Sequence, residues 1–182
     1  VKMNLNIPYM ETDNKLLNDA YRIAAGDIVG NIVYYQNGLL TEEKPCMIAG
    51  LDYNTPWTRD TAINIWNALS ILSPEVSKNT LLAVLEEEEG NIYIGGQYWD
   101  SIIWMIGARE YCRFHKDDNF YRLAFEAGRN SVHRLEEDEF DEEDGLFRGP
   151  AVYGDGIAAY PDKYSKCPNQ GSGILEWVDY PG

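Results

Sequence analysis

The sequence predicts an all-α fold built of stacked helical hairpins. Apolar residues recur at helical spacing in five segments, and helix, loop and helix alternate along the chain. The segments are residues 14–35, 60–72, 76–85, 98–114 and 119–135. A hydrophobic fraction of 45% and an aromatic fraction of 13% exclude a disordered chain. We expect residues 1–182 to form a single domain, because chains of ~100–200 residues commonly do.

The first segment is expected to form one long helix. Thr12 or Asp13 is placed to cap its N-terminus. Gly26 and Gly30 each cost about 1 kcal/mol relative to Ala in an exposed helix, but small residues also allow helices to pack closely. The helical period of the apolar residues therefore decides the prediction.

The next two segments are expected to pair as an αα-hairpin. Pro74 ends the helix over residues 60–72, and Ser73 caps the helix that follows. The acidic run over residues 86–89 comes directly after this second helix. A further acidic run, residues 136–144, is expected to be a solvated helix end and loop, because crowded like charges disfavour a continuing helix.

The charge of the chain limits its partners. Thirty acidic and 15 basic residues give a net charge of -15, which repels nucleic acid and anionic membrane surfaces. No run of ~20 apolar residues is present, so no transmembrane segment is expected. A neutral ligand such as a sugar is compatible with this charge. The compartment stays open between cytoplasmic, periplasmic and secreted.

Cysteine and histidine are too few and too scattered for a metal centre. Cys46, Cys112 and Cys167 are odd in number and form no CxxC pair, which indicates neither a disulfide framework nor a zinc site. His115 and His133 are the only histidines and are expected at the surface. We expect no metal and no cofactor.

The clearest local motif is T-P-W-T-R-D-T at residues 55–61, directly before an apolar helix. A carboxylate at a helix start is favoured by the helix dipole, so N-terminal capping alone accounts for Asp60. The functional interpretation is that Asp60 and Arg59 bind sugar hydroxyls while Trp57 packs on the apolar face of the ring. Both interpretations stand at this point.

A second motif, G-G-Q-Y-W-D-S at residues 95–101, repeats this arrangement before another helix. Two such loops are what a barrel of helical hairpins presents at one rim. Gln97, Trp99 and Asp100 are therefore further candidates for sugar binding, and a capped helix with a half-buried Trp99 is the structural alternative.

The tetrapeptide W-T-R-D at residues 57–60 resembles the W-x-R-D motif of glucoamylases and the R-D-T motif of glycogen-debranching glucosidases. These enzymes, like the similar processing α-glucosidases, are six-hairpin glycosidases. The resemblance implies an (α/α)6 toroid, of which this chain is expected to form the N-terminal part. It also implies that Arg59 and Asp60 hold the hydroxyls of the terminal sugar.

The resemblance places the catalytic acid in the glycine-rich loop region after the fifth helix. Asp155 is our candidate for this acid, although an Asp between two glycines is also a common turn residue. Arg148, in the same region, is a candidate for sugar binding. Inversion requires a second carboxylate roughly 6.5–9.5 Å from the acid, and we expect that base beyond Gly182.

The function expected from these residues is inverting glycoside hydrolysis of an α-linked glucoside or a related oligosaccharide. Two alternatives remain: a six-hairpin phosphorylase or lyase, and a helical carbohydrate-binding or scaffold protein without turnover. Part of a barrel leaves helix faces uncovered, so self-association of the chain is also expected.

Overall fold

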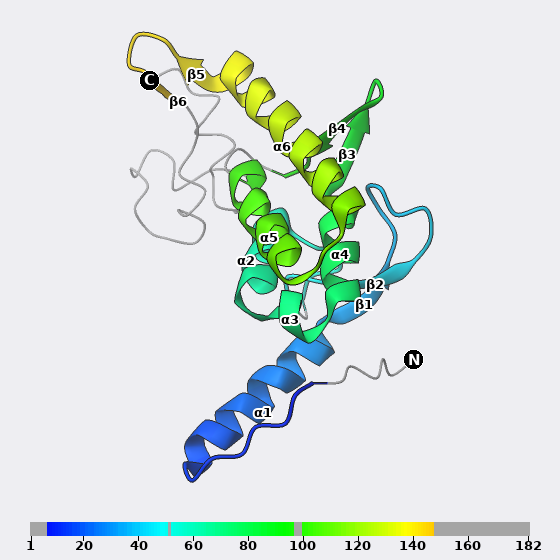
Figure 1. Ribbon diagram of the computed structural model, residues 1–182, viewed down its shortest axis with the longest axis vertical. Helices are drawn as coiled ribbons and strands as arrows, with labels where there is room; N and C mark the ends of the chain where they lie inside the picture. The colour runs from blue at the N-terminus through cyan, green and yellow to red at the C-terminus, as the bar shows by residue number, and fades with distance from the viewer. Residues whose placement is uncertain (1–6, 51, 97–99, 148–182) are drawn as a thin grey trace, which may run out of the picture.

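The computed structural model describes residues 7–50, 52–96 and 100–147 (Figure 1). The helical elements are α1 (Lys15–Gly30), α2 (Thr58–Asn64), the π-helical turn η1 (Ile65–Leu69), α3 (Ser70–Leu72), α4 (Pro74–Ala83), α5 (Asp100–Phe114) and α6 (Asp118–Glu139). The strands are β1 (Ile32–Tyr35), β2 (Lys44–Met47), β3 (Leu85–Glu88), β4 (Asn91–Ile94), β5 (Phe140–Asp141) and β6 (Leu146–Phe147).

The prediction of an all-α (α/α)6 toroid is wrong for the fold observed. Three two-stranded antiparallel sheets, β1–β2, β3–β4 and β5–β6, alternate with the helices and make the fold mixed α/β. Four of these strands have four residues each and the other two have only two. Strand β1 and the start of β3 lie in segments predicted to be helical, and β5 and β6 lie in segments predicted to be a helix end and a loop. Strands β2 and β4 lie in segments for which no element was predicted.

The first segment changes from helix to strand near its end. Asn14, rather than Thr12 or Asp13, caps α1, and its side chain accepts hydrogen bonds from the backbone amides of Leu16 and Leu17. The helix ends at Gly30, and β1 follows with the sequence I-V-Y-Y. Residues that are β-branched or aromatic favour an extended backbone, and pairing with β2 decides the outcome.

The acidic run after α4 forms a hairpin. Glu88 pairs with Asn91, and the two residues between them, Glu89 and Gly90, have φ angles of 52° and 80°. Two consecutive positive φ angles define a type I′ turn, which suits a two-residue hairpin loop. This hairpin places Glu86 beside the start of α5, where it lines a cavity with Asp100.

The helices predicted in the middle of the chain are confirmed with shifted ends. The helix expected over residues 60–72 is observed as α2, η1 and α3 in succession, with one π-helical turn inside it. Ser73 is the N-cap residue of α4, but its side chain makes no capping hydrogen bond. Pro74 occupies the first turn of α4, where its missing amide proton costs nothing.

Helix α6 runs further than its charge pattern indicates. It continues to Glu139, through the acidic residues expected to end it. Its buried residues Phe120, Ala127 and Ser131 anchor it along α5 and β4, and tertiary packing outweighs the like-charge repulsion. The short β5–β6 hairpin follows and is closed by an edge contact between Phe140 and Phe147, whose ring centroids are 5.2 Å apart.

The core lies between α2, α4, α5 and α6. Trp104 on α5 is fully buried and donates a hydrogen bond from Nε1 to the Leu81 carbonyl. Helices α2 and α5 touch at their backbones, because a Cβ atom added to Gly107 would lie 2.8 Å from the Cα atom of Ala62. This contact fixes the two helices whose N-termini form the site described below.

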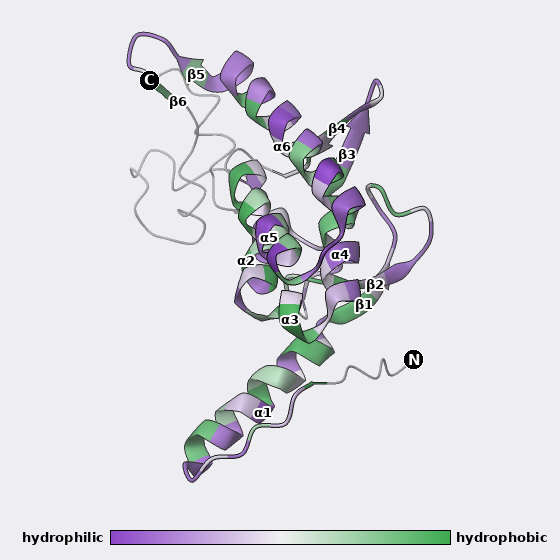
Figure 2. Cartoon of the chain, viewed as in Figure 1, coloured by the Kyte–Doolittle hydropathy of each residue, from purple (hydrophilic) through white to green (hydrophobic). Residues whose placement is uncertain are grey.

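Helix α1 projects away from this core (Figures 1 and 2). None of its residues is buried, and Leu16, Leu17 and Ile23 expose 80%, 49% and 66% of their surface. Only its C-terminal end, through Ile28, packs against the core. The described part of the chain thus leaves the apolar residues of α1 in contact with solvent.

Among the described residues, none of the helices combines the length and the apolar character that crossing a membrane requires. Cys46 is buried and Cys112 half-buried, and both are free thiols. Burial raises the pKa of Cys46 to about 12, so this thiol is an inert part of the core. Cys167 lies outside the described residues.

Candidate functional site

The two sequence motifs meet where α2 and α5 begin. Thr58, at the first position of α2, is buried and donates a hydrogen bond from its hydroxyl to the Gly95 carbonyl over 2.9 Å. This bond joins the first residue of α2 to the residue that follows β4. The two helices pack along each other below it.

An ion pair links the two helix starts across 41 residues of sequence. Arg59 Nη1 lies 2.8 Å from Oδ1 and 3.0 Å from Oδ2 of Asp100. The Asp100 side chain is 1% exposed and that of Arg59 is 19% exposed. Removing one partner of such a buried pair typically costs about 3–5 kcal/mol, because the other charge stays buried without compensation.

Gly96 is required beside this pair. Its φ angle is 113°, in the region that favours glycine, and a Cβ atom added there would lie 2.5 Å from Asp100 Oδ2 and 2.8 Å from Thr58 Oγ1. The glycine therefore lets the backbone of the second motif approach the Asp100 carboxylate closely. This is a structural reason for a glycine in the G-G-Q-Y-W-D-S motif.

An aromatic cluster stands next to the ion pair. The guanidinium carbon of Arg59 lies 5.5 Å from the centre of the Trp57 ring, which is 37% exposed. The Tyr53 ring meets Trp57 edge-on, with centroids 6.2 Å apart. A half-exposed indole held from two sides is the kind of surface on which a sugar ring packs.

A cavity of about 280 Å³ opens between the helix starts and the first two hairpins. Trp57 and Asp100 line it, and Arg59 adjoins it through its bond to Asp100. Other walls come from β1, the loop after it, the first motif, the C-terminal end of α4, β3 and the second motif: Tyr35, Asn37, Thr55, Pro56, Thr58, Val84, Glu86, Gly95 and Gly96. Burial raises the pKa of Tyr35 above its ordinary value.

Asp60 lies in the first turn of α2 and is half-buried. Burial raises the pKa of its carboxyl, which outweighs the opposite effect of the Arg59 charge, and the charge of Asp100 adds to the rise. Within the described part of the chain its carboxylate accepts no hydrogen bond except from its own backbone amide. Asp60 is thus a partly desolvated acceptor that does not line the cavity itself.

Arg59 also keeps donors available. Among the described residues, its guanidinium donates hydrogen bonds only from Nη1 and only to Asp100. The Nη2 and Nε groups are not engaged by any described residue, so the guanidinium can donate to a ligand while it stays paired.

Four of the candidate site residues fall in the described part of the chain. The structure brings Trp57, Arg59 and Asp100 into contact and places Asp60 next to them in the same helix turn. Gln97, Trp99, Arg148 and the proposed acid Asp155 lie outside the described residues.

The sequence analysis did not single out Tyr35, Asn37, Tyr53 or Glu86. Two of them belong to hairpins that were assigned to a helix or its flank. The available signals were the I-V-Y-Y run of β1 and the E-G turn before the I-Y-I run of β4.

The arrangement offers charged donors, charged acceptors and an aromatic surface around one cavity. These are the groups that bind a polyhydroxylated ring. Within residues 7–50, 52–96 and 100–147, no three His, Cys, Asp or Glu side chains are grouped to hold a metal ion.

Comparison with known proteins adds no relative. No protein-family model, curated protein or solved structure matches the chain significantly.

Proposed function

We propose that this protein binds a sugar unit of an α-linked glucoside at the start of α2 and α5 and contributes this subsite to glycoside hydrolysis. The observation that carries the proposal is the buried ion pair between Arg59 and Asp100 beside the half-exposed ring of Trp57. The resemblance of W-T-R-D to glucoamylase-type glycosidases agrees with it.

In this proposal each charged residue has its own part. Asp100 fixes the guanidinium of Arg59, whose remaining donors bind a sugar hydroxyl. Asp60 accepts a second hydroxyl, which restores a partner to a carboxylate that burial has partly desolvated. Trp57 packs against the apolar face of the ring.

The test is thermal unfolding of the parent and Asp60→Asn with a panel of α- and β-linked disaccharides. A ligand that binds the native state raises the unfolding temperature, and we expect one α-glucoside to do so for the parent but not for Asp60→Asn. Asp118→Asn is the matched control, because Asp118 is exposed and lies in the first turn of α6. It should respond like the parent.

Hydrolysis is tested separately through Asp155. We propose that this residue donates the proton to the leaving oxygen, so Asp155→Asn should keep the ligand-induced stabilisation and lose turnover. Full turnover by Asp155→Asn excludes this role. Turnover is measured on a chain long enough to include the base that we expect beyond Gly182. Stabilisation without any turnover by that chain favours the alternative of a carbohydrate-binding protein, and no stabilisation by any sugar excludes both.

We also infer that the uncovered apolar residues of α1 support self-association. Figure 2 shows apolar residues along this helix where it stands away from the core.

A further inference from the structure

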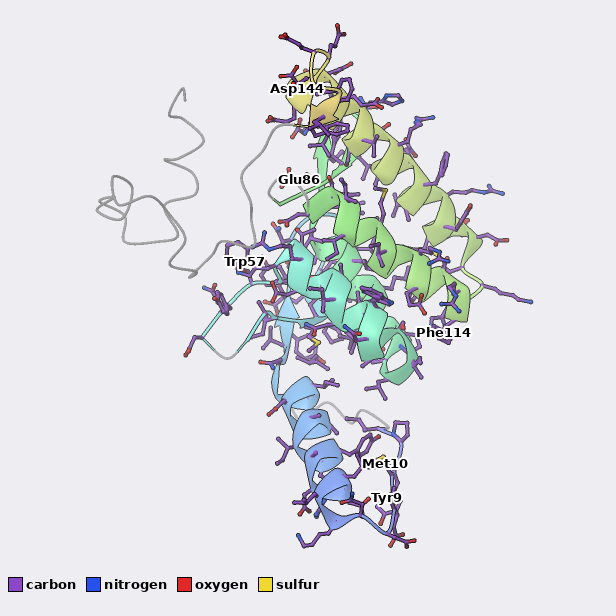
Figure 3. All side chains as sticks on the ribbon, turned by 90° about the vertical axis from the view of Figure 1, so that its left-hand side faces the viewer. Tyr9, Met10, Trp57, Glu86, Phe114 and Asp144 are labelled. Carbon is purple, nitrogen blue, oxygen red and sulfur yellow. The ribbon has the colours of Figure 1, made fainter. Side chains whose placement is uncertain are left out.

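A second cavity adjoins the candidate site. It has a volume of about 320 Å³ and lies between the β3–β4 hairpin, the start of α5 and the C-terminal half of α6. Glu86, Gly95 and Gly96 line both this cavity and the one at Trp57. Figure 3 shows Trp57 and Glu86 on the same side of the molecule, one above the other.

We propose that the two cavities form one groove that binds an oligosaccharide of at least two sugar units, with Glu86 contacting the ligand where they join. This inference rests on the proposed function, because the cavity at Trp57 is taken as the first subsite. It adds a second subsite built from residues that the sequence analysis did not assign.

The second cavity offers the same groups as the first. The guanidinium carbon of Arg134 lies 3.4 Å from the centre of the Tyr93 ring, and Arg134 Nη2 lies 2.6 Å from Glu88 Oε2. These contacts hold the guanidinium in place. Asp138 lies one helical turn further along α6 and adds an acceptor. The second cavity therefore has a paired Arg, an aromatic ring and a carboxylate, as the first cavity does.

Glu86 is placed to contact a ligand in either cavity. A Cβ atom added to Gly95 would lie 2.5 Å from Glu86 Oε1, so the carboxylate sits against this backbone segment. Glu86 and Glu88 lie on the same face of β3, since side chains two residues apart in a strand point the same way. That face also meets Arg134 through Glu88.

The backbone segment that lines both cavities is held from both sides. Ser131 accepts a hydrogen bond from the Ile94 amide over 2.8 Å, and Asn130 donates one to the Ile92 carbonyl over 3.1 Å. On the other side, Thr58 donates to the Gly95 carbonyl. A segment fixed by α2 and α6 together forms a preorganised site, which lowers the entropy that a ligand must lose in binding.

The size of the groove matches an oligosaccharide. Each cavity alone lies near the lower end of the ~300–1,000 Å³ found for small-molecule sites, whereas the two together fall well inside that range. A ligand longer than one sugar ring is therefore the occupant that uses both.

Isothermal titration of the whole chain with glucose, maltose and maltotriose tests the inference. We expect the affinity of the parent to rise by about fivefold or more from glucose to the longer sugars, as one or two additional hydrogen bonds provide. Arg134→Gln, at a residue that lines the second cavity alone, should remove this gain and leave the affinity for glucose within about twofold of the parent. Glu86→Gln should also remove the gain and should weaken glucose binding as well, because Glu86 lines both cavities. Arg129→Gln, an exposed Arg of α6 outside both cavities, is the control.

The outcomes separate the two proposals. If glucose binds but affinity does not rise with length, or if Arg134→Gln and Glu86→Gln keep the full gain, the second subsite is excluded and the first remains. If none of the three sugars binds, the proposed α-glucoside subsite is excluded and the longer groove with it. Circular dichroism of each variant shows that a lost gain does not come from unfolding.

Discussion

At the scale of single residues, Asp60 carries a carboxylate whose ionisation is opposed by its surroundings. Burial raises its folded-state pKa above the ordinary value of 3.8. As pH rises past that value, the unfolded chain releases this proton first, so the native state holds more protons over the interval between the two pKa values. The free energy of unfolding therefore falls as pH rises through this interval.

Asp60→Asn removes this effect and is expected to increase the free energy of unfolding at pH 7, with the difference vanishing below pH 3.8. Urea unfolding between about pH 3.5 and 7.5 measures this difference in the free energy of unfolding. Asp118→Asn provides the contrast: an exposed first-turn carboxylate favours the helix, so its loss should destabilise by about 0.3–1 kcal/mol. If Asp60→Asn is less stable than the parent at neutral pH, the ionised Asp60 carboxylate does not lower the stability of the native state, and this interpretation of Asp60 is wrong.

At the scale of elements, the β3–β4 hairpin carries Glu86 into the site on a turn with one unfavourable residue. Glu89 has a φ angle of 52°, and Gly90 follows it at 80°. A left-handed conformation costs a residue other than Gly or Asn roughly 1–2 kcal/mol.

Glu89→Gly should therefore stabilise the protein by up to about 1 kcal/mol, the remainder being offset by the greater freedom of glycine in the unfolded chain. It also removes one charge from the acidic run. Gly90→Ala, which forces a Cβ atom into the second left-handed position, should act in the opposite direction. Thermal unfolding of both variants checks the turn, and an unchanged midpoint in both excludes the type I′ geometry.

The elements also show how far the sequence could predict this fold. The α5 and α6 helices have long apolar periods, and the sequence placed both with small shifts at their ends. Strands of two to four residues carry no such period: the residues of β1 also fit the helical period of α1, and those of β3 are three consecutive glutamates after Leu85. Pairing between strands decided these segments, and pairing partners are not visible in a local pattern.

The candidate site was likewise predictable where its residues lie at helix starts and not where they lie on short strands. The sequence singled out Trp57, Arg59 and Asp100 because each stands at a helix start with a recognisable motif. It could not predict that Glu86 lines the same cavity, since this depends on the hairpin that the acidic run forms.

At the scale of the whole molecule, a net charge of -15 and an exposed apolar helix act against each other. Copies of the chain repel at low ionic strength, where the Debye length is about 30 Å, and less so at 0.15 M, where it is about 8 Å. Association through α1 is therefore expected to strengthen with salt.

Sedimentation velocity at increasing sodium chloride concentration measures this balance. The parent should associate at high salt, and Leu16→Glu with Ile23→Glu should keep it monomeric. Tyr121→Glu with Phe125→Glu, which adds the same two charges at exposed sites of α6, is the matched control and should still associate. A parent that stays monomeric at every salt concentration contradicts the role of α1.

The contact between Gly107 and Ala62 has a consequence for the ion pair at the N-terminal ends of α2 and α5. A relative tilt of the two helices would take place about this contact. Asp100 lies seven residues from Gly107, and Arg59 lies three residues from Ala62. At 1.5 Å per residue these separations are roughly 10 Å and 4–5 Å along the two helices. A small tilt at the contact becomes a larger displacement at the Asp100 carboxylate. A larger side chain at position 107 is therefore expected to move Asp100 relative to Arg59, although Gly107 itself lies outside the site.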